Sequence, residues 1–112
     1  MGRGDYLGEF EQIVLLAVAR LGEEGYGTTI RREIERRTGR QVSVGALYAT
    51  LERLERKDFL STWESEPTAR RGGRAKRHFR LAPSGVRALE ESREMLESLW
   101  DGVDLGAARR AR

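Results

Sequence analysis

The stretch Ser43 to Lys57, SVGALYATLERLERK, decides the fold of this chain. Ser43 can cap the start of a helix, because its hydroxyl can accept a hydrogen bond from a free backbone N–H. Apolar residues then recur three, four and three positions apart, which is helical spacing and predicts one inward stripe of Val44, Leu47, Leu51 and Leu54. The opposite face is small near its start and basic near its end, which suits entry into a DNA major groove. Taken alone, the pattern favours a plainer interpretation, an amphipathic helix with a solvated face.

Composition limits the chain to one small, highly charged domain. It has 112 residues, of which 38% are hydrophobic and 35% charged, enough for a modest core. The absence of cysteine excludes disulfides and cysteine-based metal sites, which leaves oligomerisation as the common way to support so small a core. No apolar run approaches membrane-spanning length, and MGRGDYLGEF lacks the apolar core of a signal peptide. We therefore expect a cytoplasmic protein with no membrane partner.

Charge is unevenly distributed along the chain, although the formal net charge is only +3. Residues 70–80 hold six cations and no acid, namely Arg70, Arg71, Arg74, Lys76, Arg77 and Arg80. Residues 84–105 hold six acids against only Arg87 and Arg93. This polarity indicates that one end of the molecule meets a polyanion and the other end does not.

Two helices are predicted before the opening stretch, after an N-terminus at residues 1–8 that is expected to be flexible apart from Leu7. The first covers Glu9 to Leu21 and ends at Gly22; its apolar face holds Phe10, Ile13, Val14, Ala17 and Leu21, widened by Leu15, Leu16 and Val18. Such a wide face fits either a central core helix or a helix that also meets another subunit. The second helix runs from about Thr28 to Thr38 and turns Ile30 and Ile34 inward.

A β-hairpin is predicted after the opening stretch. Phe59 to Glu66 and Ala75 to Leu81 have strand character, and a basic glycine loop separates them. Three helices followed by such a hairpin define a winged helix-turn-helix over residues 9–82, a mainly helical α+β fold. Guanidinium groups on the loop suit contacts with phosphates or insertion into a minor groove.

The last predicted helix, residues 83–105, carries an apolar seam that nothing later in the sequence covers. Pro83 suits its first position, where a missing N–H costs nothing. We interpret it as a dimerisation helix, followed by a disordered basic tail at residues 106–112. The expected dimer interface consists of Phe10, Val14, Leu89, Leu96, Leu99, Trp100 and Val103. Trp100 fits simple packing, but a pair across a two-fold axis could also sandwich a planar aromatic ligand.

No enzyme chemistry is indicated. His78 is the only histidine, and no cysteine or tight carboxylate cluster joins it, so we expect no metal. A nucleophile elbow, a general acid/base pair of carboxylates and a GxxxxGK[ST] loop are all absent. We expect no cofactor.

Four ordered segments, YG at 26–27, GALYATLERLE at 45–55, RGGRAKR at 71–77 and RLAPSG at 80–85, give the chain a strong resemblance to the PadR family of bacterial transcriptional regulators. The resemblance covers roughly residues 7–92. It implies a homodimer that binds a palindromic operator, usually as a repressor. The single helix after the hairpin is similar to the short class of the family, in which that helix and the first helix usually form the dimer. Some members bind planar aromatic compounds at the dimer interface, which would make Trp100 a ligand-binding candidate.

Residue by residue, the resemblance implies a DNA-binding surface. Tyr48 occupies the recognition-helix tyrosine of the family, and Asp58 stands where glycine is common. Together with candidate phosphate contacts, the expected DNA-binding set is Ser43, Gly45, Ala46, Tyr48, Ala49, Thr50, Arg53, Arg31, Arg32, Lys57, Arg71, Arg74, Lys76 and Arg77. Two other functions stay open: a ligand-responsive sensor, and a winged-helix module that binds protein.

Overall fold

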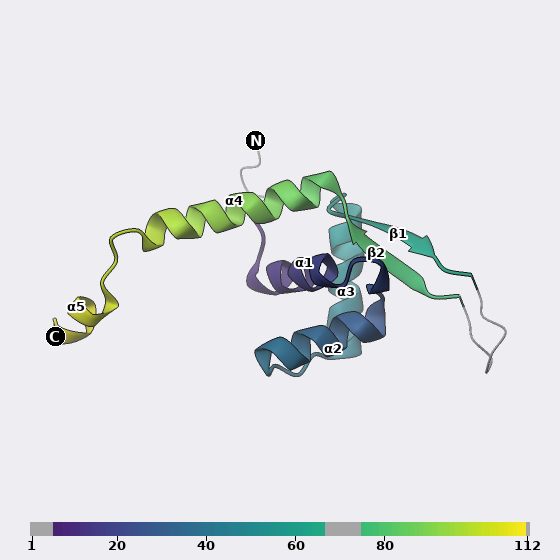
Figure 1. Cartoon of the computed structure of the whole chain (residues 1–112), viewed down its shortest axis with the longest axis horizontal. Helices are drawn as coiled ribbons and strands as arrows, with labels where there is room; N and C mark the ends of the chain where they lie inside the picture. Colours follow the sequence, from purple (N-terminus) through teal and green to yellow (C-terminus); the bar gives the residue numbers. More distant parts are fainter. Residues whose placement is uncertain (1–5, 67–74, 112) are drawn as a thin grey trace.

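The computed structural model describes residues 6–66 and 75–111 and has the predicted mainly helical architecture with one antiparallel hairpin (Figure 1). Its elements in order are α1 (Glu9–Leu21), η1 (Gly22–Glu24), α2 (Gly27–Thr38), α3 (Val44–Arg56), β1 (Leu60–Glu64), β2 (Arg77–Leu81), α4 (Pro83–Trp100) and α5 (Leu105–Arg110). None of the helices in these residues is long and apolar enough to cross a membrane.

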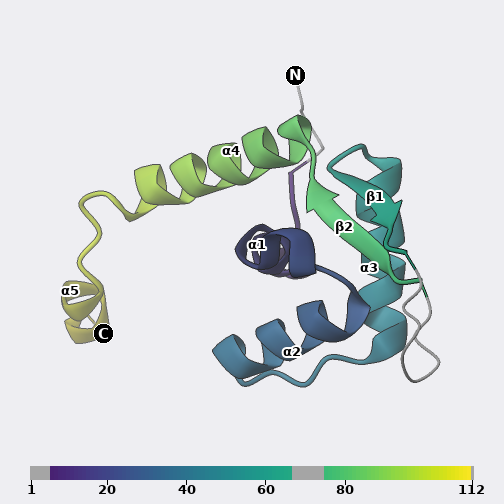
Figure 2. The same cartoon turned by 45° about the vertical axis from the view of Figure 1, so that its right-hand side comes forward.

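Helix α1 lies at the centre of the core. It contacts α2, α3, β2 and α4, and Figure 2 shows it enclosed by these elements. Its wide apolar face is used within the protomer, because Leu15 and Val18 are as fully buried as Val14. The prediction that Val14 contacts a second subunit is therefore wrong. Leu16, on the other side of α1, is 51% exposed.

The start of α3 follows the predicted cap but not the predicted stripe. The Ser43 hydroxyl accepts a hydrogen bond from the Ala46 N–H at 3.1 Å, and Leu47, Leu51 and Leu54 are buried as expected. Val44 is instead 52% exposed, because it lines a hollow between α2 and α3 rather than the core. Val42 takes the buried place, as an apolar residue just before an N-cap commonly does.

A left-handed turn ends α3 and aims the chain into the hairpin. The Phe59 N–H bonds to the Leu54 carbonyl at 3.0 Å and the Asp58 N–H to the Glu55 carbonyl at 2.9 Å, which is a Schellman motif. Asp58 has φ of +66°, a conformation in which glycine is favoured. The structure thus gives a physical reason for the glycine that the resemblance implies at this position.

The hairpin is shorter than predicted and is tied to the start of α2. Its pairs run from Leu60 with Leu81 to Glu64 with Arg77. Tyr26 forms an isolated bridge with His78, and the Phe79 N–H donates to the Gly25 carbonyl at 2.8 Å. Residues 67–74 lie outside the described residues, and with them the predicted DNA contacts Arg71 and Arg74.

The C-terminal part of the chain differs from the predictions. Of residues 1–8, predicted to be flexible apart from Leu7, the structure describes 6–8, and Leu7 is buried in the core. Helix α4 ends at Trp100 rather than 105, and Gly102 with φ of +78° turns the chain. Residues 106–110 of the tail that was predicted to be disordered form α5 together with Leu105, because the Asp104 carboxylate accepts from the Ala107 N–H at 3.0 Å and the helix ends in good helix formers, Ala107 to Arg110.

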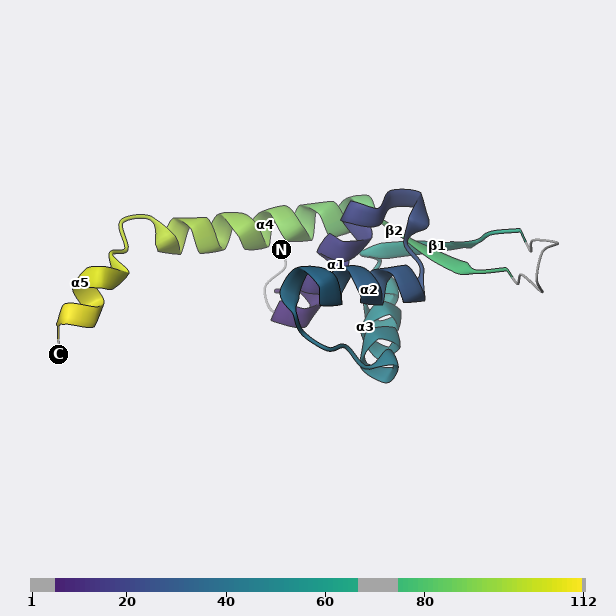
Figure 3. The same ribbon diagram turned by 60° about the horizontal axis from the view of Figure 1, so that its bottom comes forward.

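Only the first half of α4 packs against the domain. Gly85 and Ser92 are its buried residues, and every residue from Arg93 to Trp100 is exposed. A side chain at Gly85 would place its Cβ 2.3 Å from the Phe59 carbonyl oxygen, so α4 begins where only glycine fits. The second half projects away from the other elements, on the side opposite the hairpin (Figures 1 and 3).

Candidate nucleic-acid interface

The outer face of α3 consists mainly of small side chains that are exposed to solvent. Most of the predicted groove-facing residues are exposed there, namely Ser43, Gly45, Ala46, Tyr48 and Ala49. Small side chains let a helix backbone approach base edges closely. Thr50 does not belong to this face. It is 4% exposed and its hydroxyl lies 3.4 Å from the Arg53 Nη2, so its predicted groove contact is wrong.

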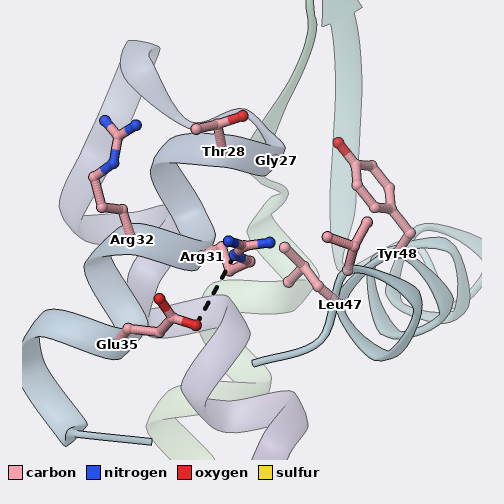
Figure 4. Close-up of a pocket in the computed structure, with 8 residues that line it drawn as sticks. Gly27, Thr28, Arg31, Arg32, Glu35, Leu47 and Tyr48 are labelled. Carbon is pink, nitrogen blue, oxygen red and sulfur yellow. Dashed lines mark ion pairs between the residues drawn. The ribbon is translucent and has the colours of Figure 1, made fainter. Parts of the chain in front are cut away.

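Cations of α2 lie beside this face, across the hollow between α2 and α3 (Figure 4). Arg31 and Arg32, the predicted phosphate contacts of this helix, both line that hollow. Arg31 has an acidic neighbour, with its Nε 3.9 Å from the Glu35 Oε2, a distance and exposure at which an ion pair holds little energy. Arg32 is exposed and extends away from that pair in Figure 4. The α2 cations therefore remain accessible to a polyanion.

Cations at the loop end of the hairpin lie on the other side of Tyr48. Lys76 and Arg77 line a second hollow together with Arg32 and Tyr48. The Lys76 ammonium lies 4.6 Å from the ring centroid of Tyr26, a cation–π distance. Arg77 forms an ion pair with Glu55, which offsets part of the charge that was predicted to face DNA. Of the two cations, Arg77 is thus the one whose charge is partly balanced by an acidic side chain among the described residues.

Arg53 and Lys57, which were predicted to contact phosphates, both form ion pairs with Glu11. The Arg53 Nε and the Lys57 Nζ lie 3.0 and 3.1 Å from the Glu11 Oε2, and the Gly8 N–H donates to the Glu11 Oε1 at 2.9 Å. Glu11 is only 6% exposed. These contacts attach the second half of α3 to the first turn of α1. The interface considered below therefore omits Arg53 and Lys57.

The balance of interactions keeps Glu11 ionised. Burial raises the pKa of its carboxyl, but the hydrogen bonds from the Gly8 N–H, Arg53 and Lys57 outweigh it, so the pKa lies below the ordinary 4.5. Sequence patterns did not identify Glu11, because the residues involved are 42 and 46 positions apart. Its place among buried apolar residues of α1 was the available signal.

An aromatic cluster supports the loop end of the hairpin strands, at the pair of Trp63 with His78. His78 is 6% exposed and stacks on Trp63 with ring centroids 4.1 Å apart. Tyr26 meets the same imidazole edge-on at 5.2 Å. The His78 Nδ1 lies 2.9 Å from the Glu23 carbonyl oxygen, and because a carbonyl only accepts, this nitrogen carries the proton. The histidine is thus structural, and within the described ranges no three metal-ligating side chains lie together.

The expected dimer residues, apart from Val14, lie at or near the surface. Phe10 and Leu89 are half-buried, and Leu96, Leu99, Trp100 and Val103 are between 44% and 66% exposed. A hollow between α1 and α4 is lined by Leu16, Leu89, Leu96 and Trp100, with polar side chains around them. Leu16 was not among the predicted interface residues, although it widens the apolar face of α1 that was expected to meet either the core or another subunit.

A three-helix core, an exposed small-residue face on α3 and a β-hairpin beside cations define a winged helix-turn-helix DNA-binding domain. The profile of the transcriptional regulator PadR-like family matches residues 15–91. The chain therefore belongs to the PadR-like family of transcriptional regulators. Members of this family regulate transcription.

Individual similar proteins agree with this assignment. Transcriptional regulator Rv3488 of Mycobacterium tuberculosis is 40% identical over 76 residues, which is 68% of this chain and just under two thirds (66%) of that protein. A PadR-like transcriptional regulator from Bacillus cereus has a TM-score of 0.70 at 16% identity, over 92% of this chain and 93% of its own. F93 from STIV, a winged-helix DNA-binding protein, has a TM-score of 0.67 at 22% identity, over 85% and 95%. Because the last two proteins are only 16% and 22% identical to this chain, their similarity establishes the fold alone.

The Glu11 site predicts a pH-dependent loss of stability. Glu11→Gln removes a carboxylate whose pKa is lowered by folding, so its contribution is present above the unfolded-state pKa and fades as the pH falls. We expect a loss of about 1–2 kcal/mol in the free energy of unfolding at pH 7, since both cations are partly solvated. Urea denaturation at pH 7 and pH 3 measures it. Glu52→Gln, an exposed carboxylate on α3, is the control, and an equal loss at both pH values would contradict the assignment.

Proposed function

We propose that this protein is a homodimeric transcriptional repressor that binds a palindromic operator. The observation that carries the proposal is the exposed outer face of α3, where Gly45, Ala46 and Ala49 leave the helix backbone accessible. These residues, with Ser43 and Tyr48, meet base edges in the major groove. Repression and the palindrome are what membership in the family supports. Such a regulator works beside the chromosome, in the cytoplasm.

The flanking cations supply phosphate contacts on two sides of α3. Arg31 and Arg32 contact the backbone on the α2 side, and Lys76 and Arg77 on the hairpin side. Arg71 and Arg74, which lie outside the described residues, extend this set toward the minor groove on the strength of their sequence alone. Contacts of this kind fix the register of the protein on DNA and make its affinity depend on salt.

The exposed half of α4 supports the dimer. Leu96, Leu99, Trp100 and Val103 are large apolar side chains that are 44% to 66% exposed and lie close together in sequence, and grouped exposed apolar residues commonly mark a protein interface. We propose that they pack against the same residues of a second copy, together with Leu16 and Phe10 of α1. A two-fold dimer brings two copies of α3 to successive major grooves, roughly 34 Å apart.

A second function rests on the hollow between α1 and α4. It has a volume of about 460 Å³ and is mainly apolar, with Trp100 beside Leu96 and with Arg93 and Glu97 around them. A hollow of this size suits a planar aromatic compound of a few rings. We propose that such a compound acts as an effector, binding where the dimer helices meet and changing their spacing.

The DNA surface predicts two different kinds of loss. Tyr48→Ala should weaken operator binding by about 1–3 kcal/mol and relax sequence preference, whereas Lys76→Ala should weaken operator and random DNA alike and reduce the salt slope by about 1. The operator is first selected from random DNA. Fluorescently labelled operator and random duplexes are then titrated with each variant at several salt concentrations, which measures both losses.

Arg87→Ala, an exposed cation on α4, serves as the control. Wild-type affinity of Tyr48→Ala for the operator would remove Tyr48 from the interface. A wild-type protein that binds no DNA at physiological salt would favour the protein-binding module instead.

The proposed dimer contact of α4 predicts that a substitution there halves the mass of the protein in solution. Leu99→Glu places a charge in the apolar exposure of α4, which should convert the dimer to monomer and weaken operator binding because one half-site is lost. Sedimentation equilibrium measures the mass. Ser61→Glu adds the same charge at an exposed position on β1 and should leave the dimer intact. A wild-type protein that is monomeric at all concentrations contradicts the proposal.

The effector hollow predicts selective quenching. The chain has two tryptophans, Trp63 in the hairpin cluster and Trp100 in the hollow, and their fluorescence can be separated by substitution. A planar acridine dye should quench the Trp63→Phe variant, which keeps Trp100, much more than the Trp100→Phe variant. Equal quenching in both would rule out the hollow as the binding site.

A further inference from the structure

Gly27, the first residue of α2, is a glycine that its own backbone does not require. Its φ is not among the left-handed angles, which belong to Gly22, Gly39 and Gly102. Alanine at this position would favour a helix more than glycine does. Gly27 is nevertheless buried, so a neighbour restricts what can stand there.

The neighbour is Tyr48. A Cβ built on Gly27 would lie 1.9 Å from the Tyr48 Oη and 2.6 Å from its Cζ, far inside contact distance. The phenol end of the ring therefore occupies the space of the missing side chain. Tyr48 leaves the outer face of α3, where it is 38% exposed, and reaches across to the start of α2 beside Thr28 (Figure 4).

The seated ring also separates the two hollows of the interface. Both hollows are lined by Gly27, Thr28, Arg32 and Tyr48. One continues to Arg31 and Val44, and the other continues to Lys76 and Arg77. A movement of the ring therefore changes the wall that both groups of cations share.

We propose that Gly27 is a positioning residue that seats the phenol of Tyr48 across the start of α2 and thereby determines operator affinity. The inference rests on the proposed function, in which Tyr48 meets DNA. A methyl group at residue 27 forces the ring into another rotamer, since the overlap involves the end of the side chain rather than backbone. The hydrophobic core is unchanged, but the phenol of Tyr48 no longer packs against the start of α2.

The test is a double-mutant cycle between Gly27→Ala and Tyr48→Ala, read as affinity for the selected operator. We expect Gly27→Ala to weaken binding about tenfold or more without lowering the melting temperature. In the Tyr48→Ala background the same change should have no further effect, because the ring it displaces is gone. Gly8→Ala, at the start of α1, is the control, since a Cβ there meets only the Glu11 Oε1 at 3.9 Å.

The Tyr48 ring resonances in NMR spectra, assigned by their loss in Tyr48→Ala, give a second measurement. They should shift in Gly27→Ala and stay unchanged in Gly8→Ala. If Gly27→Ala does not fold but the double variant does, the steric relation is supported. If neither folds, it is overturned.

The remaining outcomes separate the inference from the function on which it rests. Wild-type operator affinity in Gly27→Ala, while Tyr48→Ala binds weakly, overturns the role of Gly27 alone. Equal losses from Gly27→Ala with and without Tyr48 overturn it as well, because Gly27 then acts through its own backbone. Wild-type affinity in Tyr48→Ala overturns the inference and also the proposed contact of Tyr48 with DNA.

Discussion

The buried carboxylate of Glu11 is the interaction on which the placement of α3 depends. It joins three parts of the chain at one point, the residue before α1, the first turn of α1 and the second half of α3. Apolar packing of Leu47, Leu51 and Leu54 is non-directional and would tolerate rotation of α3 about its axis. Two charge-assisted hydrogen bonds to one oxygen fix that rotation. The exposed face that begins at Ser43 follows from it.

Much of the architecture could be predicted from local patterns. Helical spacing gave the three helices of the core, Ser43 gave the start of α3, and the change to strand character gave the hairpin. These features depend on residues close in sequence, whose periodicity and capping chemistry act within a few positions. The glycine expected in place of Asp58 also has a local cause, since a left-handed residue closes the helix.

Contacts between distant residues account for what could not be predicted. Val14 and Leu16 lie two positions apart on α1, and only the packing of α2, α3 and α4 around that helix decides which of them is buried. Thr50 has a groove-compatible side chain but is on the buried side of α3. The ion pairs of Arg53, Lys57 and Arg77 could not be predicted, because their acidic partners are distant in the sequence and are brought close only by the fold.

The left-handed turn at Asp58 has a consequence for how this protein can change. A residue with a Cβ is held there in a conformation that costs an L-amino acid roughly 1 kcal/mol. The turn is distant from the outer face of α3, at the opposite end of that helix. Substitution of Asp58 by glycine, which needs one codon change, would therefore increase the free energy of unfolding without altering the DNA-facing residues. The added stability would allow the protein to tolerate destabilising substitutions on the outer face of α3. Its descendants could then recognise a new operator while they keep the same fold.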